Sequence, residues 1–481
     1  MNTRETLIYN LQSIVGKKYV VYEPEDLIVF EYDGSVDKAI PLAVVLPNST
    51  EEVSRIVQLC KRQCLPIIPR GAGTGLSGGS IAEQGGVVIA LTRMTKILEI
   101  DTQNQLAIVE PGLVNIDLSN AVSKHGLYYA PDPSSQKTCT IGGNVAENSG
   151  GPHCLAYGVT TNHILGMEVV YSDGSIQWVG SPSRETPGYD LRGILIGSEG
   201  TLAIVTKIIV RLLKKPESTK TLLAVFKEVD HASAAVSGII SEGIVPAALE
   251  MMDQLCVQAA EQAVHAGYPP DAGAVLLVEL DGLKETVAEE AEEVEDICRK
   301  YEPIEIRVAT DELEREKLWT ARKGVIGALG RFAPNYLLAD GTVPRTKLVE
   351  ALTKVREISK RHGLLIANVL HAGDGNLHPC VLFDERKPGD VEKALTVGGE
   401  ILKMCVGLGG VLSGEHGIGL EKQEYMPLMF SAEDMEAMGK LKPAFSSEGI
   451  FNPGKIFPTG APCADMTSSS AIARTGVNTY I

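Results

Sequence analysis

The chain has 481 residues, 44% of them hydrophobic, which is enough for two or three domains with buried cores. Its 61 acidic and 44 basic residues give a net charge of −17, and no Lys/Arg cluster stands out, which argues against nucleic acid as a partner. The sequence shows no signal-like N-terminus, no Cys-x-x-Cys pair and no apolar run of 18 residues. We therefore expect a reduced, cytoplasmic protein without a transmembrane segment. Peripheral attachment to a membrane stays open.

Short β-rich runs separated by long polar stretches characterise the first 215 residues. Ser49-Thr50-Glu51-Glu52 predicts a capped helix that runs to about Cys64. Strands are predicted at 65–69, 86–91, 106–112, 167–174 and 201–213. Loops as long as 70–80 and 131–152 inside a compact region usually bind a ligand.

Three glycine-rich segments lie in this region, at 70–80, 131–151 and 197–202. The first contains a formal GxGxxG pattern, but two more glycines and a β-run follow it, so it does not open a helix as a Rossmann turn does. Its successive backbone N–H groups can still form a concave nest for a pyrophosphate. Any one such segment is usually a turn, whereas three together indicate a large cofactor.

A change of pattern at residues 214–216 predicts a domain boundary. Two β-α-β patterns follow, over 221–252 and 274–310, and they predict a ferredoxin-like sheet enlarged by a hairpin at 364–383. The helix at 284–301 has an acidic outer face, as a solvated helix does. The tail from about residue 461 shows no periodicity and is expected to be disordered.

Three of the nine histidines occur in two short glycine-flanked segments, HAGDGNLH and GEHG. His371 and His378 flank a turn between two strand-like runs, so their imidazoles can meet across a hairpin. With Glu415 they form a set that suits zinc, manganese or ferrous iron and leaves coordination positions open. His416 can face the same space as a free base. The alternative is a hairpin with two polar residues and an unrelated loop; two matching segments favour the site.

The glycine segments PRGAGTGLSGG, PDPSS, TIGGNVAENSGG and GSEGTLAIVT resemble the flavin-binding signatures of vanillyl-alcohol-oxidase-type (PCMH-type) FAD domains. HAGDGNLH, GEHGIG and FNPGKIF resemble the C-terminal domain of FAD-linked oxidases, and the similarity extends from about residue 20 to 458. Within this family the chain most resembles FAD-binding subunits of bacterial glycolate oxidases, with D-lactate and D-2-hydroxyglutarate dehydrogenases as near relatives.

The resemblance implies an α+β fold in three parts. A two-lobed PCMH-type FAD-binding domain is expected at 1–215, with its core at about 38–215. A ferredoxin-like antiparallel-sheet cap with the metal site is expected at 216–425. A C-terminal helical segment at 426–460 would return to the FAD, before the disordered tail at 461–481.

The resemblance also implies FAD as the cofactor, with the pyrophosphate on 71–75 and 78–79. The flavin would lie against residues 131–144, and Glu199 and Thr201 near the adenosine half. Non-covalent attachment is expected because 70–80 contains no histidine or cysteine, although Cys139 and His153 lie in the second segment. The predicted cofactor-binding residues are Arg70, Gly71, Ala72, Gly73, Thr74, Gly75, Gly78, Gly79, Pro131, Asp132, Thr140, Gly142, Gly143, Asn144, Ser149, Gly150, Glu199, Gly200, Thr201, Asn452 and Lys455.

By the same resemblance, His371, His378 and Glu415 are the metal ligands and His416 is the base. Arg322 would bind the substrate carboxylate. The alternative interpretation of Arg322 is an exposed arginine on a helix. Asn376 would orient the metal ligands or the substrate. The 2-hydroxyglutarate enzymes hold a distal carboxylate with a threonine and a lysine, where Ile326 and Leu338 align here. Two apolar residues favour a small monocarboxylate.

The resulting hypothesis is oxidation of a small D-2-hydroxy acid, glycolate or D-lactate, to the 2-oxo acid by hydride transfer to flavin N5, with a divalent metal. The alternatives are a D-2-hydroxyglutarate-type dehydrogenase, a metallohydrolase without flavin, and a non-catalytic FAD-binding subunit. No cysteine pattern suits an iron–sulfur cluster. The resemblance therefore implies electron transfer through companion subunits, a second flavin subunit and an iron–sulfur protein.

Overall fold

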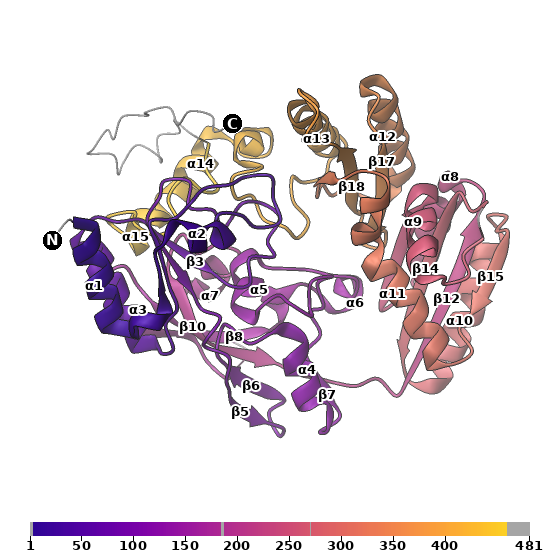
Figure 1. Ribbon diagram of the computed structural model, residues 1–481. Helices are drawn as coiled ribbons and strands as arrows, with labels where there is room; N and C mark the ends of the chain where they lie inside the picture. The colour runs from indigo at the N-terminus through magenta and orange to yellow at the C-terminus, as the bar shows by residue number, and fades with distance from the viewer. Residues whose placement is uncertain (1–2, 184–186, 270, 459–481) are drawn as a thin grey trace.

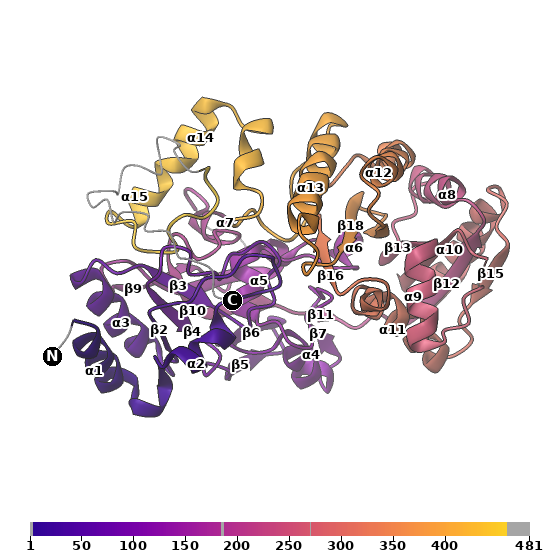
Figure 2. The same cartoon turned by 45° about the horizontal axis from the view of Figure 1, so that its top comes forward.

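The computed structural model describes residues 3–183, 187–269 and 271–458. Two lobes lie side by side, the first formed by the chain up to about residue 215 and the second by a large sheet and its helices (Figure 1). The C-terminal helices α14 (Ala432–Gly439) and α15 (Leu441–Phe445) lie over the first lobe (Figure 2). This is the α+β fold predicted above. No helix in the described ranges is long and apolar enough to span a bilayer.

The first lobe begins with a four-stranded sheet of order β1-β2-β4-β3, in which β2, β4 and β3 are parallel. Helices α1 (Thr3–Val15) and α3 (Thr50–Arg62) share its hydrophobic core. The Ser49 hydroxyl accepts the Glu52 N–H at 3.3 Å, which confirms the predicted capped helix. The strands are β1 (Val20–Val21), β2 (Ala43–Val45), β3 (Ile67–Arg70) and β4 (Val87–Ala90).

A five-stranded antiparallel sheet of order β5-β6-β10-β8-β9 completes the first lobe. The runs predicted at 106–112, 167–174 and 201–213 contain β6, most of β8 and β10, so those strands are confirmed. A short ribbon of β7 and β11 lies where the chain leaves the lobe. The strands are β5 (Ile97–Asp101), β6 (Leu106–Val109), β7 (Leu127–Tyr128), β8 (Ile164–Val170), β9 (Ile176–Gly180), β10 (Ile204–Arg211) and β11 (Leu213–Lys214).

The glycine-rich composition of 131–152 predicts a loop, and this prediction is wrong over Ile141–Glu147, which form helix α5. Thr140 caps this helix by accepting the Gly143 N–H at 3.2 Å. Ile141 and Val145, four residues apart, are both fully buried in the core of the second sheet. Capping and burial together outweigh the low helix propensity of two glycines and an asparagine.

The second lobe is built on a seven-stranded antiparallel sheet of order β15-β12-β14-β13-β17-β18-β16. Its first four strands and helices α8 and α10 form the predicted ferredoxin-like unit, and the β17–β18 hairpin enlarges the sheet as expected. The strands are β12 (Ser218–Phe226), β13 (Ala248–Asp253), β14 (Ala274–Gly282), β15 (Glu305–Val308), β16 (Asn335–Leu338), β17 (Ile366–His371) and β18 (Asn376–Phe383).

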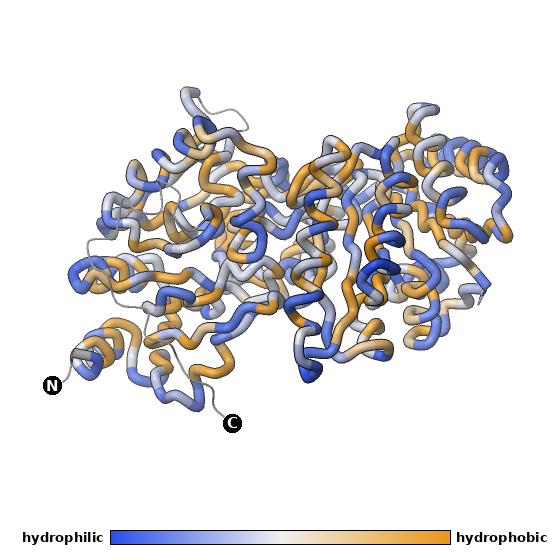
Figure 3. The backbone as a smooth tube through the Cα atoms, turned by 90° about the horizontal axis from the view of Figure 1, so that it is seen from above, coloured by the Kyte–Doolittle hydropathy of each residue, from blue (hydrophilic) through white to orange (hydrophobic). Residues whose placement is uncertain are grey.

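Helices cover both faces of this sheet. The first face is covered by α8 (Val229–Ser241), α10 (Lys284–Arg299), α12 (Leu348–His362) and α13 (Asp390–Gly407). The other is covered by α9 (Gln254–Val264) and α11 (Glu312–Ala328). Figure 3 shows these helices alternating between hydrophilic and hydrophobic residues, as amphipathic helices do. Strand alternation puts Glu250, His371 and His378 on the α9–α11 face, because their neighbours Leu249, Leu370 and Leu377 belong to the opposite core.

The chain crosses back to the first lobe near its end. Ile67 N–H donates to Ile450 O, and Asn452 N–H donates to Ile67 O, both at 2.8 Å, so residues 450–452 run beside β3. Phe451 is fully buried in the core between α1, α3 and the first sheet. The predicted disordered tail at 461–481 lies outside the described residues.

Candidate active site

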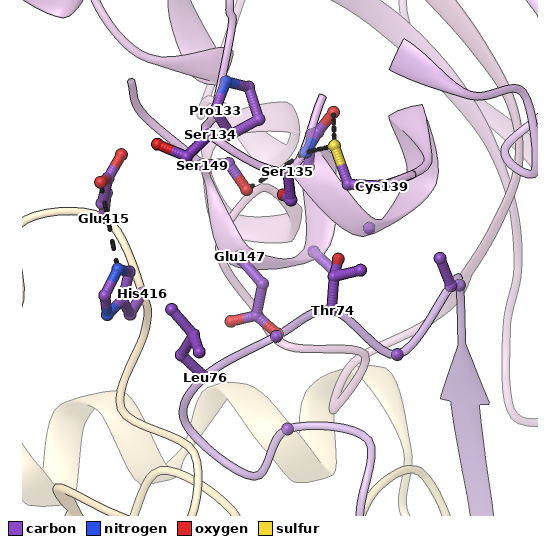
Figure 4. Close-up of a pocket in the computed structure, with 18 of the residues that line it drawn as sticks. Thr74, Leu76, Pro133, Ser134, Ser135, Cys139, Glu147, Ser149, Glu415 and His416 are labelled. Carbon is purple, nitrogen blue, oxygen red and sulfur yellow. Dashed lines mark hydrogen bonds and ion pairs between the residues drawn. The ribbon is translucent and has the colours of Figure 1, made fainter. Parts of the chain in front are cut away.

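A cavity of about 350 Å³ opens between the glycine-rich segments of the first lobe and the histidine-bearing segments of the second (Figure 4). Most predicted site residues line it: Gly71, Ala72, Gly73, Thr74, Gly75, Gly79, Thr140, Gly143, Asn144, Ser149, Glu199, Gly200, Arg322, His378, Glu415 and His416. The predicted residues that do not line it are Arg70, Gly78, Pro131, Asp132, Gly142, Gly150, Thr201, His371, Asn376, Asn452 and Lys455.

The first glycine segment joins β3 to β4 without a helix, as the sequence predicts. Arg70 lies behind it and donates to Tyr32 O at 2.8 Å and to Ser80 Oγ at 3.1 Å. Gly73 has φ +73°, and a Cβ there would lie 2.1 Å from Arg70 Nη2. The segment therefore needs glycine, and its backbone stays open to a ligand in the cavity.

Residues 452–455 of the C-terminal segment hold the glycine-rich loops through hydrogen bonds. The buried Asn452 amide donates to Gly79 O and to Glu199 O, both at 2.7 Å, and Lys455 Nζ donates to Ile81 O at 2.8 Å. The Glu199 carboxylate accepts the N–H groups of Ile418 and Gly419 at 2.7 and 2.8 Å. Asn452 and Lys455 therefore shape the cavity through the loops they hold.

Replacing Asn452 with alanine should weaken the binding of FAD, the cofactor expected from the sequence, about tenfold or more. The change leaves two buried carbonyl oxygens without a donor, at a cost of roughly 1–3 kcal/mol. Titration of the apoprotein with FAD measures this affinity, and thermal unfolding measures the accompanying loss of stability. Unchanged FAD affinity with a lowered melting temperature would contradict a role in shaping the cofactor loops.

Asp132 and His153 join the two lobes. His153 Nδ1 lies 2.9 Å from Asp132 Oδ2 and its Nε2 lies 3.3 Å from Glu279 Oε1, while Lys323 Nζ donates to Asp132 at 3.0 Å. Burial alone would lower the pKa of His153, but Asp132 and Glu279 raise it to about 10. Both ring nitrogens of His153 are engaged, so this side chain is not available to a flavin.

Cys139, the other residue that could bond to a flavin, does line the cavity. Its sulfur packs 3.4 Å from the Asn144 amide nitrogen, and burial raises the pKa of the thiol. A neutral thiol is a poor nucleophile.

The histidine cluster lies where the β17–β18 hairpin meets residues 414–417. His371 pairs with Asn376 and His378 with Val369, so the histidines are diagonal neighbours and not directly opposite. Their rings are perpendicular, with centroids 5.0 Å apart. The Nε2 atoms of His371 and His378 lie 3.1 and 3.0 Å from Glu415 Oε1.

This donor set fits a divalent metal. Ligand atoms around a tetrahedral zinc ion are about 3.3 Å apart, close to the separations seen here. Three ligand atoms leave a coordination position open for a substrate.

Glu250, which the sequence-based prediction omitted, supports this cluster. It lies opposite His371 on β13, 2.8 Å from His371 Nδ1, and pairs with Arg322. Burial opposes charge on His371, yet Glu250 and Glu415 raise its pKa to about 10. Carboxylates that contact the outer nitrogen of a metal-binding histidine orient its ring. The available signal was a carboxylate flanked on both sides by apolar residues of a strand.

His416 lies beside the cluster with its ring stacked on His378, the centroids 5.0 Å apart and the planes 9° apart. Its Nε2 is 4.0 Å from Glu415 Oε1 (Figure 4). Burial, with help from His378 and Lys422, lowers the pKa of His416 to about 4 against the opposing effect of Asp340. The imidazole is therefore uncharged at neutral pH. The sequence-based prediction also omitted Asp340 and Lys422.

Arg322 is 2% exposed, which excludes the alternative of an exposed helix arginine. It lines the cavity from α11, together with Lys323 and Ile326 from the same helix and Leu338 from β16. Asn376 is buried beneath the loop, where a Cβ on Gly414 would lie 2.4 Å from its amide. Asn376 therefore supports the loop that carries Glu415.

Residues 41–180 match the family described as FAD binding domain, and residues 215–456 match the family described as FAD linked oxidases, C-terminal domain. The chain belongs to the FAD-linked oxidases and is an FAD-binding oxidoreductase.

Among its relatives, the glycolate oxidase subunit GlcD of Escherichia coli (strain K12) is 45% identical over 464 residues, 96% of this chain and 93% of the relative. The D-lactate dehydrogenase of Anaerostipes hadrus is 34% identical over 430 residues, 87% and 90% of the two chains. The solved structure of p-cresol methylhydroxylase with substrate bound has the same fold, with a TM-score of 0.80 at 17% identity, covering 95% and 97% of the chains.

Proposed function

We propose that this protein oxidises a small D-2-hydroxy acid, glycolate or D-lactate, to the 2-oxo acid with FAD and a divalent metal. The observation that carries the proposal is the position of His378, Glu415 and His416 on the same cavity as the glycine-rich segments. The names of two relatives, a glycolate oxidase subunit and a D-lactate dehydrogenase, support the same substrate class. The FAD-binding match disfavours a hydrolase without flavin.

Bound FAD would supply an acceptor, flavin N5, for the hydride that leaves C2. A divalent ion held by His371, His378 and Glu415 would bind the substrate carboxylate and C2 oxygen and lower the pKa of the hydroxyl. His416 takes the hydroxyl proton, because its uncharged imidazole lies next to that set. Arg322, buried beside the cavity, pairs with the substrate carboxylate. Loss of one hydride and one proton converts the hydroxy acid to the oxo acid.

The cavity wall favours a monocarboxylate. Ile326 and Leu338 both line it, and neither apolar side chain can pair with a second carboxylate. Lys323 lines it too, but its ammonium pairs with Asp132 at 3.0 Å. A D-2-hydroxyglutarate-type substrate is therefore the second candidate.

Our proposal includes non-covalent FAD, with residues 1–215 as the FAD-binding domain, 216–425 as the cap and 426–460 as the returning segment. A relative named as an oxidase subunit supports assembly with companion subunits. We propose that these are a second flavin subunit and an iron–sulfur protein that carry electrons away. A cytoplasmic location, with the complex on the membrane surface, is part of the same proposal.

The visible spectrum of the purified protein, recorded before and after anaerobic addition of substrate, tests this function. Glycolate or D-lactate should bleach the flavin bands, and D-2-hydroxyglutarate should bleach them at least tenfold more slowly. Faster bleaching by the dicarboxylate would overturn the substrate class. Flavin that no 2-hydroxy acid reduces, in metal-loaded protein, would favour a non-catalytic FAD-binding subunit.

A further inference from the structure

Glu147, the last residue of helix α5, lines the same cavity from the first lobe. Its Oε1 atom lies against the first glycine-rich segment, 2.7 Å from the position that a Cβ on Gly79 would take and 3.9 Å from that of a Cβ on Gly75. Figure 4 shows the Glu147 side chain beside the loop that carries Thr74 and Leu76. Its carboxyl group therefore borders the part of the cavity where the pyrophosphate of FAD is expected.

The second carboxyl oxygen of Glu147 has no partner. Its Oε2 atom is shielded from solvent and makes no hydrogen bond within the ranges that the structure describes. A Cβ on Gly417 would clash with this oxygen and would lie 2.9 Å from Oε1 of Glu199. The carboxyl groups of Glu147 and Glu199 thus face each other across a single glycine, and two carboxyl groups that share a site do not both ionise readily.

Hydrogen bonds decide which of the two carboxyl groups carries the charge. Glu199 accepts the backbone N–H groups of Ile418 and Gly419, at 2.7 and 2.8 Å. These two bonds, together with two nearby lysine ammonium groups, oppose the rise in the pKa of Glu199 that burial causes. Glu147 has no such donor, so we place the charge on Glu199 and the proton on Glu147.

The surroundings of Glu147 also favour the neutral acid. Burial raises the pKa of Glu147 well above its usual range, and the charges of Glu199 and Asp33 add to that rise. Lys422 opposes it, but the Lys422 ammonium is already engaged by the Asp340 carboxylate at 3.2 Å. A site that keeps a carboxylic acid neutral at physiological pH leaves it with a hydrogen to donate.

We propose that Glu147 is a further cofactor-binding residue, a neutral carboxylic acid that donates its O–H to an oxygen of the FAD pyrophosphate. The first glycine-rich segment offers backbone N–H groups to the same anion, and the acid adds a donor from helix α5. An ionised carboxylate at this point would instead repel the negative pyrophosphate. The inference rests on the expected place of FAD along the glycine-rich segments, and it does not depend on the substrate, the metal or the metal ligands.

The variants Glu147→Gln and Glu147→Ala distinguish a neutral donor from a negative charge. The glutamine amide can donate the same hydrogen bond, so FAD affinity should change less than about threefold in Glu147→Gln, whereas it should fall about tenfold or more in Glu147→Ala. Titration of each apoprotein with FAD measures these affinities. Clearly tighter binding by either variant, which loss of an ionised carboxylate would give, would overturn the inference. Equal weakening in both variants, or unchanged affinity in Glu147→Ala, would overturn it as well.

Asn452→Ala is the matched comparison, because it removes two hydrogen bonds to the loops that border the same cavity. It should lower the melting temperature of the apoprotein, whereas Glu147→Ala should not, since the Glu147 side chain makes no hydrogen bond within the described ranges. An equal loss of stability in Glu147→Ala would indicate a structural role and overturn the inference.

ADP-ribose, which contains a pyrophosphate but no flavin, tests the contact itself. The variants should show the same order of affinities for ADP-ribose as for FAD, and an effect confined to FAD would overturn the assignment to the pyrophosphate. None of these measurements needs a substrate, so they stay decisive if no 2-hydroxy acid is oxidised. An unmodified apoprotein that binds no FAD would refute the cofactor of the proposed function itself.

Discussion

The His416→Ala variant should retain FAD and lose substrate-driven reduction of the flavin by about 10²–10⁴-fold, the usual contribution of a general base. The loss should be in kcat, because the substrate carboxylate keeps Arg322 and the metal set as partners. Anaerobic stopped-flow mixing with glycolate or D-lactate measures the rate of bleaching directly. Turnover at the rate of the unmodified protein would refute the assignment of His416 as the base.

The variant should keep its cofactor for a structural reason. The His416 ring packs on His378, whereas Arg70 and Asn452 hold the glycine-rich segments through hydrogen bonds that do not involve this ring. The Ser77 hydroxyl donates to the His416 backbone carbonyl, which the substitution keeps. The His416 backbone N–H, which bonds Asp340, is unchanged by the substitution. His125→Ala, at an exposed position, is the matched control and should behave as the unmodified protein.

The parts of the fold that the sequence predicts are those specified by local patterns. The Ser49 cap, the apolar runs that become β6, β8 and β10, and the two β-α-β repeats each have a short-range signal, and each is present. Helix α5 is not predicted because its composition favours a loop, and burial of Ile141 and Val145 is a tertiary effect.

The residues of the candidate site also fall into two groups, those that a local sequence pattern predicts and those that depend on the tertiary structure. The histidine segments and Glu415 can be recognised as sequence motifs. The register of the hairpin cannot be predicted from the sequence, so only the structure shows that His371 and His378 are diagonal neighbours. Glu250 and Asp340 are single carboxylates in apolar runs, a signal that could have been used. Lys422 has no such signal, because its burial against Asp340 depends on how residues 413–422 fold back.

Removal of the divalent ion should abolish turnover while the flavin remains bound. The proposed metal ligands come from β17, β18 and the 414–417 loop, and FAD contacts are expected on other segments, so chelation should not release the cofactor. Flavin reduction should fall at least 100-fold after chelation, because the hydroxyl then loses the charge that lowers its pKa. Adding back Zn²⁺ or Mn²⁺ should restore it, and indifference to both steps would refute the metal role.

The Glu415→Gln variant tests whether this side chain binds the ion, which removal of the ion alone does not test. The amide keeps the shape of the side chain but removes the negative charge that both Nε2 atoms face, so Co²⁺ affinity should fall at least tenfold and metal add-back should not restore turnover. Glu400→Gln provides the control, because Glu400 also contacts a histidine, His362 at 2.9 Å, on helices outside the cavity. Loss of metal affinity in both variants would indicate a general effect of charge, whereas loss in Glu415→Gln alone assigns the ion to the cavity that faces the glycine-rich loops.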